Sequence, residues 1–175
     1  MRKTGARRAA GLGLLLAAAC APGPDRDAVR AEARRREAAA DSGFAAVQER
    51  GRAAMGVDQY TSTHRFEPLS DGGRIELQRD TADSAGRARI LAHMGEIAAA
   101  FAGGDFAVPG LVHAREVPGT AVMAARRDEI SYVVESLPRG GALRLRTADS
   151  SAVGAIHEFL AFQRQDHRAG PHHGE

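Results

Sequence analysis

Apolar and polar positions alternate along two stretches in the first half of the chain, which is typical of half-buried β-strands. The alternation runs over residues 60–66, turns at Asp71-Gly72-Gly73 and resumes over residues 74–78. This spacing predicts a β-hairpin. One face of the first strand carries Tyr60, Ser62, His64 and Phe66.

A helical pattern follows the hairpin. Thr81 to Ser84 supply N-cap residues, and Gly103-Gly104 ends the segment. Apolar residues spaced by three and four place one stripe on a single helix face. The stripe consists of Ile90, Leu91, Met94, Ile97, Ala98 and Phe101.

The second half repeats this plan in the same order. The run GGRIEL at 72–77 matches GGALRL at 140–145, and TADS occurs at both 81–84 and 147–150. Because turn, strand, cap and helix recur in sequence, we interpret the similarity as a duplication. We expect a single small α+β domain with a four-stranded antiparallel sheet. It would be built from two β-hairpin-plus-helix repeats (about 59–102 and 129–166), with both helices on one face.

A Pro/Gly-punctuated segment, 105–125, separates the repeats. We expect a long loop there, and such loops are often functional. The whole domain is expected over residues 57–168, followed by a disordered tail over 169–175. Residues 20–56 are rich in Ala, Arg and Glu, which predicts a helical or disordered tether that packs loosely. Its arginine run, 34–36, is interpreted as a solvated face, with binding of anionic headgroups as the alternative.

The first 19 residues have the layout of a secretory signal, with a basic start and an apolar run too short to span a bilayer. Leu16 to Cys20 resembles a lipobox, which predicts cleavage before Cys20 and lipidation of its thiol. Ordinary cleavage that leaves a free thiol is the alternative. We expect an exported protein anchored to the membrane of the cell envelope, on the periplasmic face of the outer membrane in a diderm host.

The charge of the chain changes when the signal is set aside. The full sequence carries 24 basic and 22 acidic residues, and four of the basic ones but none of the acidic ones precede Cys20. The mature chain is therefore slightly acidic, which argues against nucleic acid as a partner. A single cysteine excludes internal disulfides and a cysteine-rich zinc site. We find no nucleophile elbow, phosphate loop or dinucleotide fingerprint, assign no catalytic residue and favour a non-enzymatic role.

Histidine is the residue type that suggests chemistry. His64 and His93 are expected to face the interior, and His113 lies in the segment between the repeats. Neutral imidazoles are common ligands of copper and zinc, so we predict a transition-metal or small-ligand site at His64, His93 and His113. The alternative is that each is a hydrogen-bonded core residue, since no HxxxH or HExxH pair occurs.

The remaining histidines have other expected roles. His157 is placed on the buried stripe of the second helix. His167, His172 and His173 follow that helix and are expected to be mobile. Met123 is interpreted as core filler rather than as a soft copper ligand.

Several short motifs occur together over roughly residues 50–168: Met55 to Gln59, Thr63-His64, His93-Met94, Gly104-Asp105-Phe106, Pro109, Val112-His113, Pro118-Gly119 and Ile156 to Leu160. With these motifs the chain resembles a family of uncharacterised exported bacterial proteins. Some members are automatically labelled aspartate carbamoyltransferase, but this chain lacks the Ser-Thr-Arg-Thr-Arg and His-Pro-x-Gln segments of that enzyme. Members of the family often carry a further histidine where Arg65 stands and another near Glu96, so a site in this chain rests on His64, His93 and His113.

Three functions remain, in order of preference. The first is a non-enzymatic, lipid-anchored domain that binds copper, zinc or a small ligand through its histidines. The second is a structural lipoprotein that contacts another envelope protein and whose histidines are simply packed. The third is an enzyme of unknown reaction.

Overall fold

The computed structural model describes residues 26–56 and 58–169, which fall into two units, Met1–Arg36 and Glu37–Glu175. In the first unit the described residues are helical, and Arg35 and Arg36 both pair with Glu32. The predicted signal and Cys20 lie outside the described residues. Within the described ranges, no helix combines the length and the apolar character needed to cross a bilayer.

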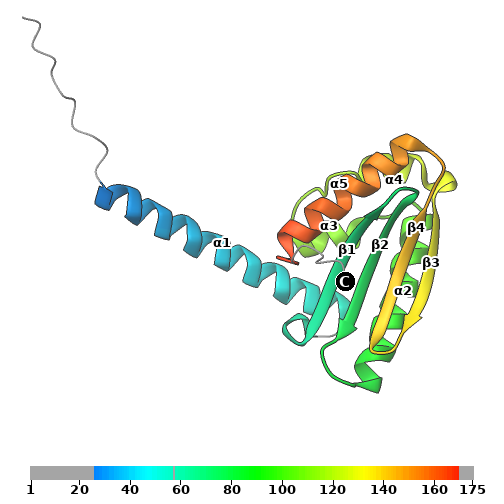
Figure 1. The fold of residues 1–175 in the computed structure, drawn as a ribbon, viewed down its shortest axis with the longest axis horizontal. Coiled ribbons are helices and arrows are strands. Elements are labelled where there is room, and N and C mark those ends of the chain that lie inside the picture. Colours follow the sequence, from blue (N-terminus) through cyan, green and yellow to red (C-terminus); the bar gives the residue numbers. More distant parts are fainter. Residues whose placement is uncertain (1–25, 57, 170–175) are drawn as a thin grey trace, which may run out of the picture. The chain divides into compact units, whose positions relative to one another are not determined.

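The second unit is a mixed α+β domain with a four-stranded antiparallel sheet (Figure 1), so the predicted fold class is confirmed. The strand order is β1-β2-β4-β3. The strands are β1 (Ser62–Leu69), β2 (Gly72–Arg79), β3 (Ser131–Leu137) and β4 (Gly140–Arg146). The longer helices are α1 (Arg26–Met55), α2 (Ser84–Ala102) and α5 (Ser150–Asp166).

The two predicted repeats meet at the centre of the sheet. Strand β2 pairs with β4 in a register that sets Ile75 opposite Leu143, the equivalent positions of GGRIEL and GGALRL. Each repeat therefore contributes the second strand of its hairpin to the β2–β4 pairing, which we call the joint of the two repeats. The N-cap residues Asp83 and Asp149 are equivalent too, since each accepts a hydrogen bond from the third residue after it.

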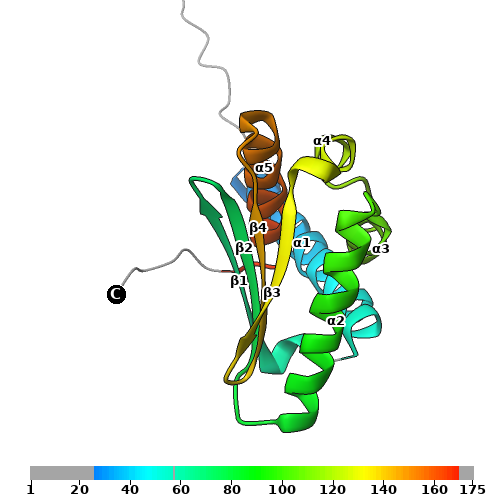
Figure 2. The same cartoon turned by 90° about the vertical axis from the view of Figure 1, so that its right-hand side faces the viewer.

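Both helices cover the same face of the sheet, as predicted. A side chain at Gly73 would meet Leu160 of α5, and one at Gly141 would meet Leu91 of α2. Gly73 and Gly141 share a face because of the β2–β4 register. Figure 2 views the sheet from its edge and shows α2 and α3 on that side. Each helix thus packs on a glycine of the other repeat.

The segment expected to be a long loop is helical instead. It forms α3 (Ala107–His113) and α4 (Thr120–Ala125), and a 3-10 turn at Arg127–Glu129 leads into β3. Pro109 lies in the first turn of α3, where its missing N–H leaves no helix hydrogen bond unmade. Gly119 begins α4 with a positive φ of 83°. The sequence pattern failed here because proline and glycine also mark helix starts.

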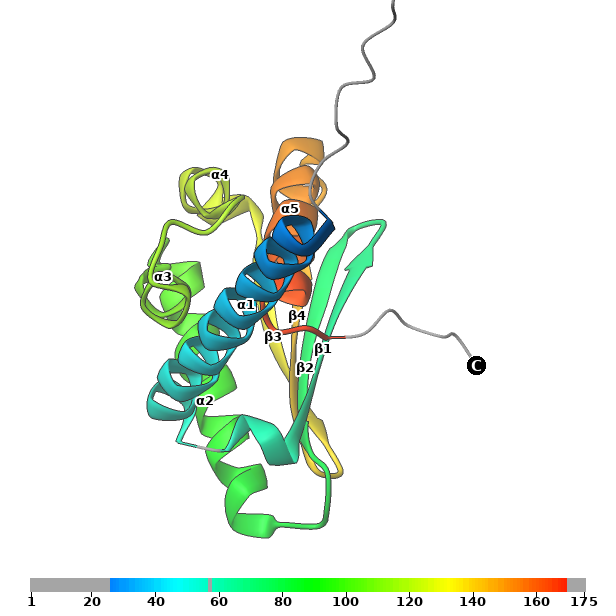
Figure 3. The ribbon, with the colours of Figure 1, turned by 90° about the vertical axis from the view of Figure 1, so that its left-hand side faces the viewer.

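The compact unit begins within α1, well before the domain start expected at residue 57. Val47 and Gln48 are buried, and Arg50 Nε donates to Val112 O over 2.7 Å. Arg168 pairs with Asp41 and lies over the ring of Phe44. The C-terminal half of α1 therefore packs on the helix-covered side of the sheet (Figure 3).

The first glycine of each GG pair sets a testable requirement. A Cβ at Gly140 would lie 2.0 Å from Leu77 O, and one at Gly72 would lie 2.3 Å from Leu145 O. We expect Gly140→Ala to lower the free energy of unfolding by about 2 kcal/mol or more, because backbone must move. Gly154 in α5 has no atom within 4 Å of such a Cβ, so Gly154→Ala should raise stability by up to about 1 kcal/mol. Urea unfolding of both variants is the measurement, and equal effects would contradict the close β2–β4 joint.

Candidate functional site

A cavity of about 90 Å³ lies over the centre of the sheet, between the helices. Its floor includes Ile75 and Leu143, the pair at the joint of the two repeats. Helices α2 and α5 cover opposite halves of the sheet. Residues of α1 and α3 supply further wall, including Met55 and Val112. The cavity is thus the space left between α2 and α5, the equivalent helices of the two repeats.

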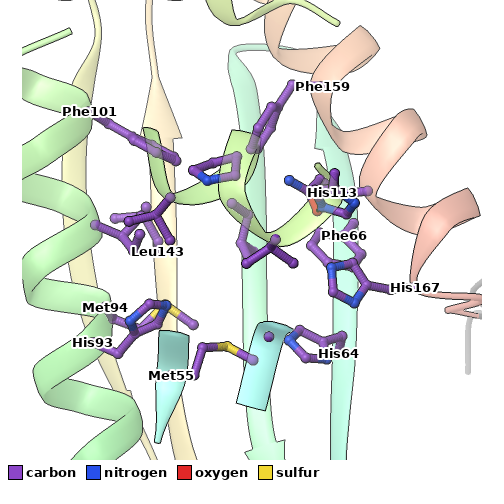
Figure 4. Close-up of a pocket in the computed structure, with 17 residues that line it drawn as sticks. Met55, His64, Phe66, His93, Met94, Phe101, His113, Leu143, Phe159 and His167 are labelled. Atoms are coloured by element: carbon purple, nitrogen blue, oxygen red, sulfur yellow. The ribbon is translucent and has the colours of Figure 1, made fainter. Parts of the chain in front are cut away.

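The cavity is apolar at one end and rich in nitrogen and sulfur at the other (Figure 4). Phe101 and Phe159 line the apolar end and meet edge to face, with ring centroids 5.9 Å apart. The other end gathers residues from four different segments of the chain. They are Met55, His64, His93, Met94 and His167.

His64 points from β1 into the cavity, as its alternation with Phe66 predicts. Its ring stacks on Phe66 at 5.7 Å and on His167 at 4.9 Å between centroids. Burial, with a smaller contribution from the neighbouring His93, lowers the pKa of His64 to about 4. His64 is therefore neutral at ordinary pH, and no described residue hydrogen-bonds to its ring.

His93 reaches the same cavity from α2 and is half-buried. Burial also lowers the pKa of His93, and the charge of Glu96 on the same helix works in the opposite direction. Its ring nitrogens, like those of His64, have no hydrogen-bond partner among the described residues. Two of the three predicted ligands thus line one cavity, and no described residue hydrogen-bonds to either ring.

His113 also lines the cavity, but both of its ring nitrogens are occupied. Nδ1 bonds to the Asp166 carboxylate, which also pairs with Arg115, and Nε2 lies 2.8 Å from Gln163 Oε1. Asp166 and Gln163 both belong to α5, so His113 fastens α3 to that helix. A nitrogen held in this way has no lone pair free for a metal. The metal role predicted for His113 stays a prediction.

His167 was expected to be mobile, and that expectation is wrong. It caps the C-terminus of α5 and lies 5.1 Å from His113 between ring centroids. Burial, reinforced by His64 and His113, lowers the pKa of His167 to about 3, with Asp166 opposing. Its Nδ1 atom is buried without a partner. The missed signal was the four-residue spacing of Phe159, Gln163 and His167, which extends the buried face of α5 to its end.

Two further residues lie away from the cavity. The Nε2 atom of His157 is 2.9 Å from Leu69 O and 3.1 Å from Gly72 O, which fixes α5 to the β1–β2 turn. Met123 is fully buried in the core and does not line the cavity, as expected for core filler. The other tail histidines, His172 and His173, lie outside the described residues.

The geometry leaves the predicted metal site without direct support. Among residues 26–56 and 58–169, no group of three or more His, Cys, Asp or Glu side chains is arranged to hold a metal ion. The described residues that line the cavity also include no carboxylate, hydroxyl or thiol. What the arrangement offers is an apolar space bordered by the rings of His64, His93 and His167, each of which in its neutral form can donate one hydrogen bond and accept one.

Comparisons with known proteins do not identify a relative of this chain. No protein-family model, curated protein or solved structure matches the chain. The family suggested by its short motifs therefore stays an interpretation of those motifs.

The depressed histidine pKa values predict acid sensitivity. The unfolded chain binds protons near pH 6.5, whereas folded His64 and His167 do so only near pH 4 and pH 3. Stability contributed by neutral histidine is therefore complete above about pH 6.5 and is lost as the pH falls toward 4. We expect His64→Gln and His167→Gln to show a shallower fall in unfolding free energy over that range.

Urea unfolding at a series of pH values measures this slope. Arg65→Gln is the matched control, because Arg65 neighbours His64 in β1 but its side chain is exposed. A wild-type slope in both histidine variants would show that these rings are not buried in the neutral form.

Proposed function

We propose that the chain is an exported, lipid-anchored binding domain that holds a small ligand in the histidine-lined cavity. The observation that carries the proposal is the buried, unpartnered Nδ1 of His167, which lies with the rings of His64 and His93 beside an apolar space. Export and anchorage rest on the signal and on Cys20. In this proposal the lipid on Cys20 attaches the chain to the membrane.

The alternative of simply packed histidines accounts less well for His167. Buried polar groups in folded proteins nearly always have hydrogen-bond partners. His113 and His157 follow that rule, with partners at 2.8 Å and 2.9 Å. His167 breaks it, and the partner that its Nδ1 lacks could be supplied by a ligand. The contrast favours a binding role over a structural one.

An enzymatic role has less support than binding. General acid–base or nucleophilic chemistry needs a carboxylate, hydroxyl, thiol or suitably tuned imidazole at the reacting atoms. The cavity offers only imidazoles, and burial lowers the pKa of His64 and His167 far below neutral pH. Imidazole rings that stay neutral can hydrogen-bond to a ligand, but they exchange protons poorly at pH 7.

Xenon tests whether the cavity accepts a guest. Apolar protein cavities of comparable size bind xenon, which needs no polar partner. We expect saturable shifts of the Ile97 and Leu143 methyl resonances when xenon is added to the mature chain, because both residues line the cavity. Val108→Phe should fill the space and abolish these shifts.

Val122→Phe is the control, since Val122 is exposed on α4 and is not part of the cavity wall. Wild-type protein that shows no saturable xenon shift would overturn the proposal. The histidines would then be packed side chains, and an envelope-protein partner would become the better explanation.

A further inference from the structure

The two ends of the cavity differ in burial as well as in polarity. Phe101 and Phe159, which line the apolar end, are each only 1% exposed. Met55, His64 and His167 line the other end, and each of them is only half-buried. Figure 4 shows these three residues together, below the two phenylalanine rings. A ligand that enters past the half-buried residues would therefore place its apolar part innermost.

The lining of the cavity also defines the charge of the ligand that fits it. The described residues that border the cavity include no Asp, Glu, Lys or Arg side chain. Gln163 is already bonded to His113 over 2.8 Å. An ion that entered this space would lose its hydration without meeting an opposite charge, which is unfavourable. We therefore expect an uncharged ligand.

Two neighbouring imidazoles at the half-buried end can share one polar group of a ligand. The rings of His64 and His167 stack with their centroids 4.9 Å apart. Nδ1 of His167 is buried without a partner, and no described residue hydrogen-bonds to His64. A neutral imidazole has one donor and one acceptor nitrogen. A hydroxyl group both donates and accepts, so it suits these two rings whichever nitrogens carry the protons, whereas a carbonyl group can only accept.

The volume of the cavity limits the hydrocarbon part of the ligand. The cavity measures about 90 Å³. Apolar cavities of roughly 150 Å³ hold a benzene molecule, so a short single chain fits this smaller space better than a large ring system. A second polar group at the end lined by Phe101 and Phe159 would be buried without a hydrogen-bond partner. The ligand should therefore be polar at one end only.

We propose that the cavity binds a short-chain alcohol, with the hydroxyl group at His64 and His167 and the hydrocarbon chain directed toward Phe101 and Phe159. This rests on the proposed ligand-binding function and names the ligand class. Each end of the cavity would then recognise one end of the same molecule, the hydroxyl group by hydrogen bonding and the chain by burial.

Methyl NMR titrations of the mature chain with 1-pentanol test the ligand class. We expect saturable shifts of the Met55 and Leu143 methyl resonances, because both residues line the cavity. The affinity should rise about fourfold with each methylene from 1-propanol to 1-pentanol, since each adds similar buried apolar area. Pentanoate and 1,5-pentanediol should bind at least about tenfold more weakly than 1-pentanol. The first would bury a charge, and the second would bury a hydroxyl group without a partner.

His64→Phe and His167→Phe test the position of the hydroxyl group. Phenylalanine keeps an aromatic ring for stacking but removes the nitrogens. Each variant should weaken 1-pentanol binding by about threefold to tenfold, the usual range for one lost hydrogen bond, and should still bind xenon. His93→Phe is the matched control and should bind 1-pentanol like the wild type, because His93 lies on the other side of Met55 (Figure 4).

Intermolecular nuclear Overhauser effects give the orientation of bound 1-pentanol. The protons beside its hydroxyl group should lie near the Met55 methyl group, and its terminal methyl group should lie near the ring of Phe101. The reverse orientation would contradict the proposal.

The outcomes separate the two proposals. Xenon binding without saturable 1-pentanol binding, or equal affinities for 1-pentanol, 1,5-pentanediol and pentanoate, would overturn the alcohol assignment and leave the ligand-binding function standing. Unchanged 1-pentanol affinity in both His64→Phe and His167→Phe would do the same. Absence of both xenon and 1-pentanol binding in the wild type would overturn both. The ligand comparisons use the wild-type chain alone, so they decide the proposal even if a histidine variant does not fold.

Discussion

The direct pairing of β2 with β4 is the constraint on which the rest of the domain depends. It joins equivalent strands of the two repeats, with Ile75 opposite Leu143 at the centre. Gly73 and Gly141 then allow each helix to pack on the hairpin of the other repeat. Once α2 and α5 occupy opposite halves of the sheet, its centre must be covered by something else.

The centre of the sheet is covered by α3 and α1, which belong to neither repeat, and they cover it incompletely. The α3 helix is held to α5 by His113, and the C-terminal half of α1 is held by Arg50, Arg168 and a small buried patch. The remaining space is the cavity. Because it lies where the repeats meet, the internal symmetry of the domain and its candidate site have the same origin.

Burial determines the chemistry of that site. An imidazole inside an apolar layer is held in its neutral form, since the charged form loses its hydration. Neutral rings keep a lone pair and an N–H, which suits ligand binding better than proton transfer at neutral pH. A histidine that serves structure has partners for both ring nitrogens within the protein, as His113 has in Asp166 and Gln163.

The sequence predicted the fold well because its signals were local and repeated. Alternation in the hairpins, the paired TADS caps and the helix stripes each specify one element, and the duplication fixes their order. The inward face of His64 followed from the same alternation.

What the sequence could not predict was long-range packing. The spacing of Phe159, Gln163 and His167 places His167 on the buried face of α5, but it does not show that this end of the helix meets His64 of β1. The free or occupied state of each histidine is likewise a property of the assembled domain. Segment 105–125 was misjudged because proline is also common in the first turn of a helix, as at Pro109, and glycine is tolerated at an N-cap, as at Gly119.

The central claim is that His64 and His167 are neutral rings with free nitrogens beside a cavity. Nitrogen-15 NMR of the histidine side chains of the mature chain at about pH 5 tests it most directly, since exposed histidine is largely charged there. The account predicts that both rings remain neutral, each with one unprotonated nitrogen. Imidazolium signals for His64 and His167 at that pH would contradict it.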